Sequence, residues 1–517
     1  MFRAPDVHEV QEVAEALGCP LSADDAAVYQ RHLSEQLADF DDFLQSQTYE
    51  VVPPRFPGAR EPGRRPTDAE DPYDAWTWRC RVTGAAEGLL AGKRVSYKDH
   101  IAVAGVPMSF GAAMLDGHVP DFDATVVSRA LEAGATIVGK NVMNGLSGGF
   151  GFGGGTGDYG RPKNPHNPDH LTGGSSSGSA VALVTGETDV SFGGDQGGSI
   201  RIPAAWSGTV GLKPTFGLVS HFGIGFGSDQ SIDFTGPMAM TVEDAARALD
   251  ATAGRDGLDP RQTARIPESY DSLSRLGDGV KGLRVGVLEE GYEGATPEVV
   301  DSVQAAIEVL ESLGAVVSKV SVPAHHHTAR AQAALGEGSL AVLDTQFFGV
   351  WTKTYYPAET IAALTEALTH HGDQVNPRTV LSHLAATFAR RTWSGRLYAK
   401  AQNIRPAITA AYDGALAEVD VLAMPTTVTQ APAYVAPEPH EVLEQAILGS
   451  RAVRATLNTQ PFNYTGHPAI AVPTEKRGGL PVSLQLVGRM LEDDLLLRAA
   501  QAYAGAVPFA DHVAVGG

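Results

Sequence analysis

Two serines each follow a Gly-Gly pair within residues 171–203. They are Ser175 and Ser199, 24 positions apart. A glycine pair allows backbone conformations that are closed to other residues, so each hydroxyl can be presented at a sharp corner, and successive amides there can bind an anion. A serine becomes a good nucleophile when a positioned base removes its proton. No histidine lies within 171–203, and the upstream candidate base is Lys98, in RVSYKDHIAVAGVPMSFG.

Lys98 can act as a base only when its amine is neutral. Burial disfavours the ammonium form and lowers the pKa of a lysine, whereas an adjacent carboxylate opposes this change. Asp99 follows Lys98 directly, but consecutive side chains of a strand point to opposite faces of the sheet. We therefore expect Lys98 at the end of a strand over 94–97, with the Asp99 carboxylate facing away from it.

Four motifs of the sequence resemble those of the amidase signature family and occur in the order typical of that family. They are KD followed by VAGVP, then GGSSSGSA, GGDQGGSIRIPA and GLKPTFG, within matching segments that run from about Lys98 to about Leu497. The resemblance implies a Ser-Ser-Lys relay, with Ser199 as the nucleophile, Ser175 on a cis peptide bond and Lys98 as the base. GGDQGGSIRIPA and TAGRDGLDPRQ are most similar to bacterial enantioselective amidases of the nitrile-degradation type.

Backbone amides at the second corner are the expected oxyanion donors. They belong to Gln196, Gly197, Gly198 and Ser199, and such donors contribute about 3 kcal/mol each to lowering a barrier. Asp195 and Arg201 flank this corner, and we interpret them as a structural frame around the nucleophile turn in preference to substrate contacts.

A glycine- and aromatic-rich stretch, NGLSGGFGFGGGTGDYGR, spans residues 144–161. We interpret it as a flexible wall of the acyl pocket, with Gly149 in its backbone and Phe150 and Phe152 as apolar surfaces. The alternative is a plain connecting loop.

Two other arrangements could carry different chemistry. Residues 174–178 fit G-x-S-x-G with Ser176 at the centre, but a nucleophile elbow needs an Asp and a His as well. His467 is the main candidate for that histidine, and a structural turn explains it better. Three consecutive histidines, 325–327, could bind a metal, although a solvated turn is the preferred interpretation. We expect no metal and no cofactor.

The composition describes a soluble globular protein. The chain has 517 residues, of which 43% are hydrophobic and 19% charged, and its net charge of -21 argues against nucleic acid or an anionic membrane as a partner. Cys19 and Cys80 are too few for a disulfide framework or a zinc site. The N-terminus lacks an apolar signal core and no run of about 18 apolar residues occurs, so a cytoplasmic protein without a spanning helix is expected.

The predicted fold is α/β: a mixed central sheet covered by helices, with an N-terminal helical extension and a small inserted domain. We predict an extension and Pro-rich linker over 1–88, a catalytic core over 89–260 and 420–517, and an insert over 261–419 that shapes substrate access. A helical stripe in the extension suggests a homodimer; its members are Tyr29, Leu33, Leu37, Phe40 and Leu44.

The predicted function is hydrolysis of a small-molecule carboxylic amide to acid and ammonia or amine, with esters or carbamates as further substrates. One alternative is an amidotransferase subunit that makes ammonia from glutamine; the helical extension and acidic composition favour a free-standing enzyme. The other is a non-catalytic binding scaffold, against which the retention of all three relay residues argues.

Overall fold

The computed structural model describes residues 3–46, 54, 56, 58–147, 157–225, 229–338, 355–436, 438, 440–445, 447 and 454–509. The chain forms two compact units, Met1–Val52 and Pro53–Gly517. No helix within the described ranges is both long and apolar enough to cross a membrane.

The first unit is a pair of helices, α1 (Val7–Ala16) and α2 (Ala23–Gln45). Asp6 and Glu9 form a capping box at the start of α1, and the Ser22 hydroxyl accepts a hydrogen bond from the amide of Asp25 at the start of α2. On α2, the Phe40 and Leu44 side chains are 56% and 73% exposed within the described structure. The predicted stripe therefore lies largely on the surface of this unit.

The second unit is built on a mixed 12-stranded sheet with the order β1-β2-β4-β3-β5-β7-β6-β11-β12-β10-β8-β9. The strands are β1 (Arg60–Arg64), β2 (Trp76–Thr83), β3 (Arg94–Lys98), β4 (Thr136–Asn141), β5 (Val190–Asp195), β6 (Val210–Lys213), β7 (Phe234–Ala239), β8 (Arg284–Leu288), β9 (Val316–Val320), β10 (Val421–Pro425), β11 (Ala469–Pro473) and β12 (Ser483–Val487).

Strand β3 lies inside the half of the sheet that begins with β1. It pairs in parallel with β4 on one side and β5 on the other, and β5 pairs antiparallel with β7. The far half contains a second parallel set, in which β8 pairs with both β10 and β9. Antiparallel pairs of β6, β11 and β12 join the two halves.

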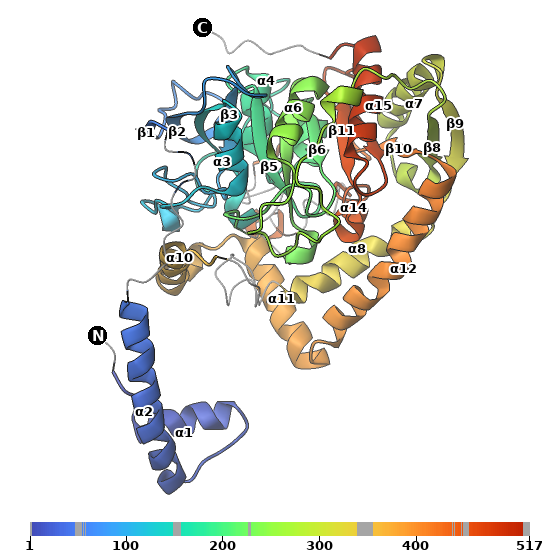
Figure 1. The fold of residues 1–517 in the computed structure, drawn as a ribbon. Coiled ribbons are helices and arrows are strands. Elements are labelled where there is room, and N and C mark those ends of the chain that lie inside the picture. The colour runs from blue at the N-terminus through green and yellow to red at the C-terminus, as the bar shows by residue number, and fades with distance from the viewer. Residues whose placement is uncertain are drawn as a thin grey trace. The chain divides into compact units, whose positions relative to one another are not determined.

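Helices cover both faces of this sheet (Figure 1). Those of the second unit are α3 (Thr125–Glu132), α4 (Ser177–Val184), α5 (Arg201–Ser207), α6 (Val242–Thr252), α7 (Pro297–Ser312), α8 (His325–Ala334), α10 (Ala358–His371), α11 (Pro377–Trp393), α12 (Arg396–Glu418), α14 (Gln460–Thr465) and α15 (Asp493–Ala506). The row α3, α6, α15 and α7 buries its apolar side in the largest core. Helices α4 and α5 pack with β7 and β11 in a separate core.

The structure differs from the sequence-based prediction at the start of this unit. The segment that we predict to be a Pro-rich linker contains β1 and β2, which pair with each other and, through β2, with β4. Strands β8 and β9, within the predicted insert 261–419, also belong to the same sheet. The predicted boundaries of the core and the insert stay predictions.

Candidate active site

Lys98 ends β3, where strands on both sides exclude water from it. Its side chain is fully buried, and Nζ donates to Ser175 Oγ at 2.7 Å and to the carbonyl of Gly194 at 3.4 Å. Asp99 points elsewhere, as the alternation of a strand predicts: its carboxylate accepts from Ser109 and lies 3.2 Å from Lys140 Nζ. Lys98 and Ser175 are thus brought together from positions 77 residues apart.

The Ser175 corner lies in the turn that leads into α4. The peptide bond between Gly174 and Ser175 is cis, and Gly173 has a φ of +77°. A Cβ on Gly173 would lie 2.9 Å from the backbone of Pro203, so glycine is needed there for both conformation and space.

The Ser199 corner lies between β5 and α5 and is joined directly to the first corner. The amide of Ser176 donates to the carbonyl of Ser199 at 3.2 Å. Ser199 itself is buried, and the φ of +131° at Gly198 turns the chain just before it. A Cβ at Gly198 would overlap the Thr459 hydroxyl and lie 2.7 Å from Ile202.

The carbonyls of this corner accept hydrogen bonds from side chains that are distant in the sequence. Asn463 donates to the carbonyl of Asp195 at 2.7 Å, Gln332 to that of Gln196 at 2.6 Å, and Thr459 to that of Gly197 at 2.6 Å.

The amides of the corner differ in whether they have a hydrogen-bond acceptor. The amide of Gly198 donates to Asp195 Oδ1 at 2.6 Å. In the part of the chain that the structure describes, no acceptor takes the amides of Gln196, Gly197 or Ser199. Gln196 and Ser199 are buried and Gly197 is partly buried, so these three amides are free to donate to an oxygen atom bound beside the Ser199 hydroxyl.

Asp195 and Arg201 form a fully buried ion pair next to the corner. The guanidinium donates to both carboxylate oxygens at 3.0 Å and also reaches Gln485 Oε1 at 3.0 Å and Asn463 Oδ1 at 2.7 Å. Burial alone would raise the pKa of Asp195, but the Arg201 charge and the hydrogen bonds that Arg201 and Asn463 donate to the carboxylate lower it to about 2. Asp195 is therefore a charged anchor for the corner.

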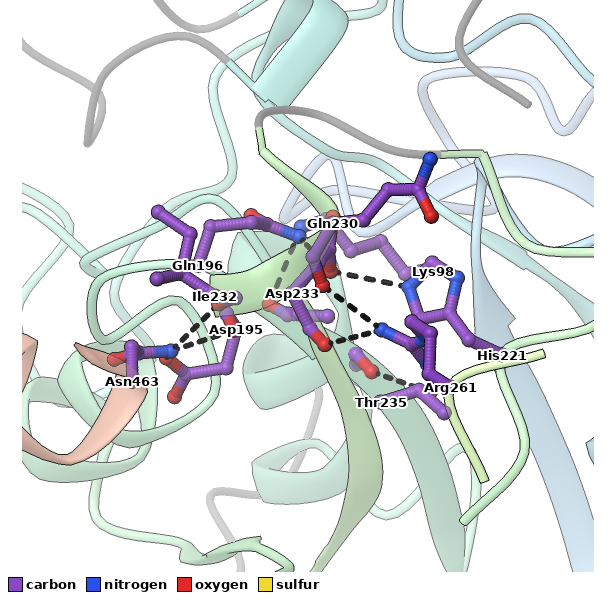
Figure 2. A network of polar contacts seen from close by, with 12 residues as sticks. Lys98, Asp195, Gln196, His221, Gln230, Ile232, Asp233, Thr235, Arg261 and Asn463 are labelled. Carbon is purple, nitrogen blue, oxygen red and sulfur yellow. Dashed lines mark hydrogen bonds and ion pairs between the residues drawn. The ribbon is translucent and has the colours of Figure 1, made fainter. Parts of the chain in front are cut away.

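Burial is the largest influence on Lys98. It lowers the pKa of Lys98 to about 7, against the opposing effects of the Asp233 and Asp195 carboxylates. Figure 2 shows how Asp233 connects to the corner: its Oδ1 accepts from Gln196 Nε2 at 2.7 Å and lies 3.1 Å from His221 Nε2. Lys98 can thus be neutral near physiological pH.

Both serine corners and Lys98 fall within a region that matches a known family. A sequence model of the family described as Amidase matches residues 69–497. The chain belongs to the amidase signature family. This amidase signature chain is 38% identical over 451 residues to an enantioselective amidase of Rhodococcus rhodochrous, with 86% of this chain and 85% of that protein covered.

Two further relatives differ from each other in kind. One subunit of the glutamyl-tRNA(Gln) amidotransferase of Haloarcula marismortui is 37% identical over 446 residues, with 84% of this chain and 99% of that protein covered. The solved structure of a peptide amidase from Stenotrophomonas maltophilia has a TM-score of 0.65 at 30% identity, with 81% of this chain and 83% of that chain covered.

Several predicted residues lie elsewhere or outside the described ranges. Gly149, Phe150 and Phe152 are not among the described residues. His325 is not part of a solvated turn: it is buried at the start of α8, with its ring nitrogens 2.8 Å from the Tyr412 hydroxyl and 3.1 Å from Asn458 Oδ1. Within the described ranges no group of side chains is arranged to hold a metal ion.

The elbow alternative also receives no support from the contacts of its residues. Ser176 Oγ donates to the carbonyl of Gly194 at 3.3 Å, and the His467 ring contacts Thr465 and Asp413. His467 lies in the short connection between α14 and β11.

Sequence analysis missed the groups that surround the relay. Asp233, His221, Asn463 and Gln332 come from segments with no local motif to single them out. His100 has a weak signal, since it stands two residues after Lys98. It is fully buried, neither ring nitrogen has a hydrogen-bond partner among the described residues, and burial holds its pKa well below the usual range.

Proposed function

We propose that this protein hydrolyses carboxylic amides through an acyl-enzyme formed on Ser199. The observation that carries the proposal is the 2.7 Å contact between Lys98 Nζ and Ser175 Oγ, beside a second serine corner whose amides at Gln196, Gly197 and Ser199 have no acceptor among the described residues. The resemblance of all three relay residues to the family pattern supports the same assignment, and so does the similarity to an enantioselective amidase.

The relay begins with the neutral amine of Lys98. It takes the proton of Ser175, which takes the proton of Ser199 as Ser199 Oγ attacks the amide carbonyl. The negative oxygen that forms is held by amides of the corner; since Gly198 already donates to Asp195, the available donors are those of Gln196, Gly197 and Ser199. Ser175 returns a proton to the leaving nitrogen, and water then cleaves the ester.

Replacement of the nucleophile tests the proposal. Ser199→Ala removes the oxygen that accepts the acyl group, so amide hydrolysis should fall to background in a variant that keeps its circular dichroism spectrum. A fluorophosphonate probe should label the native protein at Ser199, as located by peptide mass spectrometry. Substantial hydrolysis by folded Ser199→Ala would place the nucleophile elsewhere.

A substrate panel separates the candidate functions. It contains primary amides, racemic 2-substituted amides, anilides, carbamates, esters and glutamine. Similarity to an amidotransferase subunit over 99% of that protein's length makes glutamine hydrolysis the second candidate. Turnover of glutamine alone would favour the amidotransferase role, whereas turnover of the other amides by the isolated chain favours the free-standing amidase.

A further inference from the structure

Gln332 reaches the nucleophile corner from α8, 136 positions further along the chain. Its Nε2 donates to the carbonyl of Gln196 at 2.6 Å. The side chain is buried, and its Oε1 has no partner among the described residues. A Cβ on Gly197 would lie 3.3 Å from Gln332 Nε2. Among the described residues, the hydrogen bond of this side chain is therefore with the corner.

Helix α8 is held firmly enough to fix this contact. His325 and Thr328 precede Gln332 by seven and four positions, so all three lie on one face of the helix, and all three are buried. The His325 ring contacts Tyr412 on α12 and Asn458. Asn458 in turn donates to the carbonyls of Gly291 and Pro425, both at 2.7 Å.

The planarity of the peptide group makes the Gln332 contact directional. The peptide between Gln196 and Gly197 is trans, so its N–H points opposite to its carbonyl. Because the carbonyl accepts from Gln332, the amide of Gly197 points away from α8. This amide has no acceptor within the described part of the chain.

The next peptide group provides an internal comparison. Thr459 donates to the carbonyl of Gly197 at 2.6 Å, much as Gln332 does to that of Gln196. The amide on the far side of that peptide belongs to Gly198 and already donates to Asp195. Loss of the Thr459 contact therefore leaves the direction of the Gly198 amide fixed by Asp195, whereas loss of the Gln332 contact leaves the peptide of the Gly197 amide with no hydrogen bond of its own among the described residues.

We propose that Gln332 is a positioning residue for catalysis: by holding the carbonyl of Gln196 it aims the amide of Gly197 at the oxyanion. This proposal rests on the proposed acyl-enzyme function. It assigns to α8, outside the serine motifs, a part in stabilising the transition state in addition to any part in binding.

The test compares Gln332→Met, which keeps the volume but not the donor, with Thr459→Val, which removes a similar hydrogen bond from the adjacent peptide. The readouts are kcat and KM for a primary amide, and inhibition by an aldehyde analogue, whose hemiacetal with Ser199 carries the oxygen that an oxyanion would. Gln332→Met should lower kcat by about tenfold or more and should weaken inhibition by the aldehyde by a similar factor. KM should stay within about twofold of the native value. The loss in Thr459→Val should be several-fold smaller.

Three results would overturn the proposal: an unchanged kcat in Gln332→Met, equal changes in KM and kcat, or an equal kcat loss in Thr459→Val. If Gln332→Met does not fold, Gln332→Asn replaces it, because its amide is one methylene too short to reach Gln196. Fluorophosphonate labelling separates the two ideas. An unlabelled Ser199 in the native protein defeats the proposed function, whereas normal labelling with an unaltered kcat in the Gln332 variant defeats only this inference.

Discussion

Burial removes the water that would otherwise stabilise the ammonium form of Lys98, and this lowers its pKa to about 7. Two carboxylates, Asp233 and Asp195, act in the opposite direction. The balance matters because only the neutral amine can accept the proton of Ser175. At the scale of single residues, we therefore expect one side chain and its charged neighbours to set the pH dependence of hydrolysis.

We predict that kcat/KM falls as pH drops through about 7, because Lys98 gains a proton below its pKa and can no longer act as a base. Lys98→Met removes the base, and Lys98→Arg replaces it with a guanidinium that stays protonated at working pH. Both variants should lose most of the acylation rate, measured by stopped flow on folded protein. Near-native acylation by Lys98→Arg would show that the lysine acts only through its charge.

Asp233→Asn should move the acid limb of this pH profile to lower pH. The carboxylate of Asp233 raises the pKa of Lys98, so its neutralisation lets the lysine lose its proton at lower pH. In the native protein Gln196 Nε2 donates a hydrogen bond to Asp233 Oδ1 at 2.7 Å. The side-chain oxygen of Asn can accept the same hydrogen bond.

Four groups around Lys98 bear on this experiment. They are the Asp233 and Asp195 carboxylates, the His100 ring and the Ser175 hydroxyl. Thr235→Val is the control, since it removes only a neutral hydrogen bond to the carbonyl of Gly193 and should leave the limb in place. If amide turnover by the variant is too slow to measure, the pH dependence of the rate of fluorophosphonate labelling gives the position of the same acid limb. An unmoved limb in Asp233→Asn contradicts the electrostatic account.

The three proposed relay residues each stand in a local motif, so the sequence alone singles them out as candidates, and the structure brings Lys98 and Ser175 into contact. Glycines around Ser175 and Ser199, and the KD pair at Lys98, are recognisable without the fold. Asp233 and Gln332 have no such surroundings: they reach the site through sheet pairing and helix packing, which one sequence does not show.

At the scale of elements, prediction succeeded where an apolar pattern has a clear period or a cap. Strand β3, predicted over 94–97, is of this kind. Strands β1 and β7 were missed for physical reasons. The sequence of β1 is REPGR, largely exposed and without an apolar face, and β7 contains Gly236 and Pro237 in its interior, residues that ordinarily argue against a strand.

Two helical glycines should respond in opposite ways to the same substitution. Gly178 in α4 is packed so closely that a Cβ would lie 2.7 Å from the amide of Val142, so Gly178→Ala should destabilise the fold by about 2 kcal/mol or more. Gly414 in α12 has nothing within 4 Å of its Cβ position, so Gly414→Ala should stabilise by about 0.5–1 kcal/mol. Thermal melting midpoints measure both, and shifts of the same sign would contradict the packing of α4.

At the scale of the whole molecule, the N-terminal unit presents an apolar side. Phe40 and Leu44 are more than half exposed within the described structure, and monomeric proteins seldom leave such a stripe uncovered. We predict a homodimer formed through α2, to be measured by light scattering at micromolar concentration.

A pair of variants makes this prediction sharper. Adding charge to the stripe through Phe40→Asp with Leu44→Asp should give the mass of one chain. Ala38→Asp adds a charge on the opposite side of the same helix and should leave the dimer intact. A monomeric native protein ends the prediction, and dissociation by Ala38→Asp would show that the stripe is not the contact.

The contacts of Arg201 have a consequence for when the site can be completed during synthesis of the chain. Its guanidinium bonds to Asn463 and to Gln485, 262 and 284 positions later. Ribosomes add roughly 5–20 residues per second, so the interval between Arg201 and Gln485 is roughly 15–60 s of synthesis. Lys98, Ser175 and Ser199 are all made before it begins. A growing chain therefore carries Lys98, Ser175 and Ser199 throughout this interval while the buried arginine beside them still lacks two of its partners, and we expect hydrolytic competence only after Gln485 has been made.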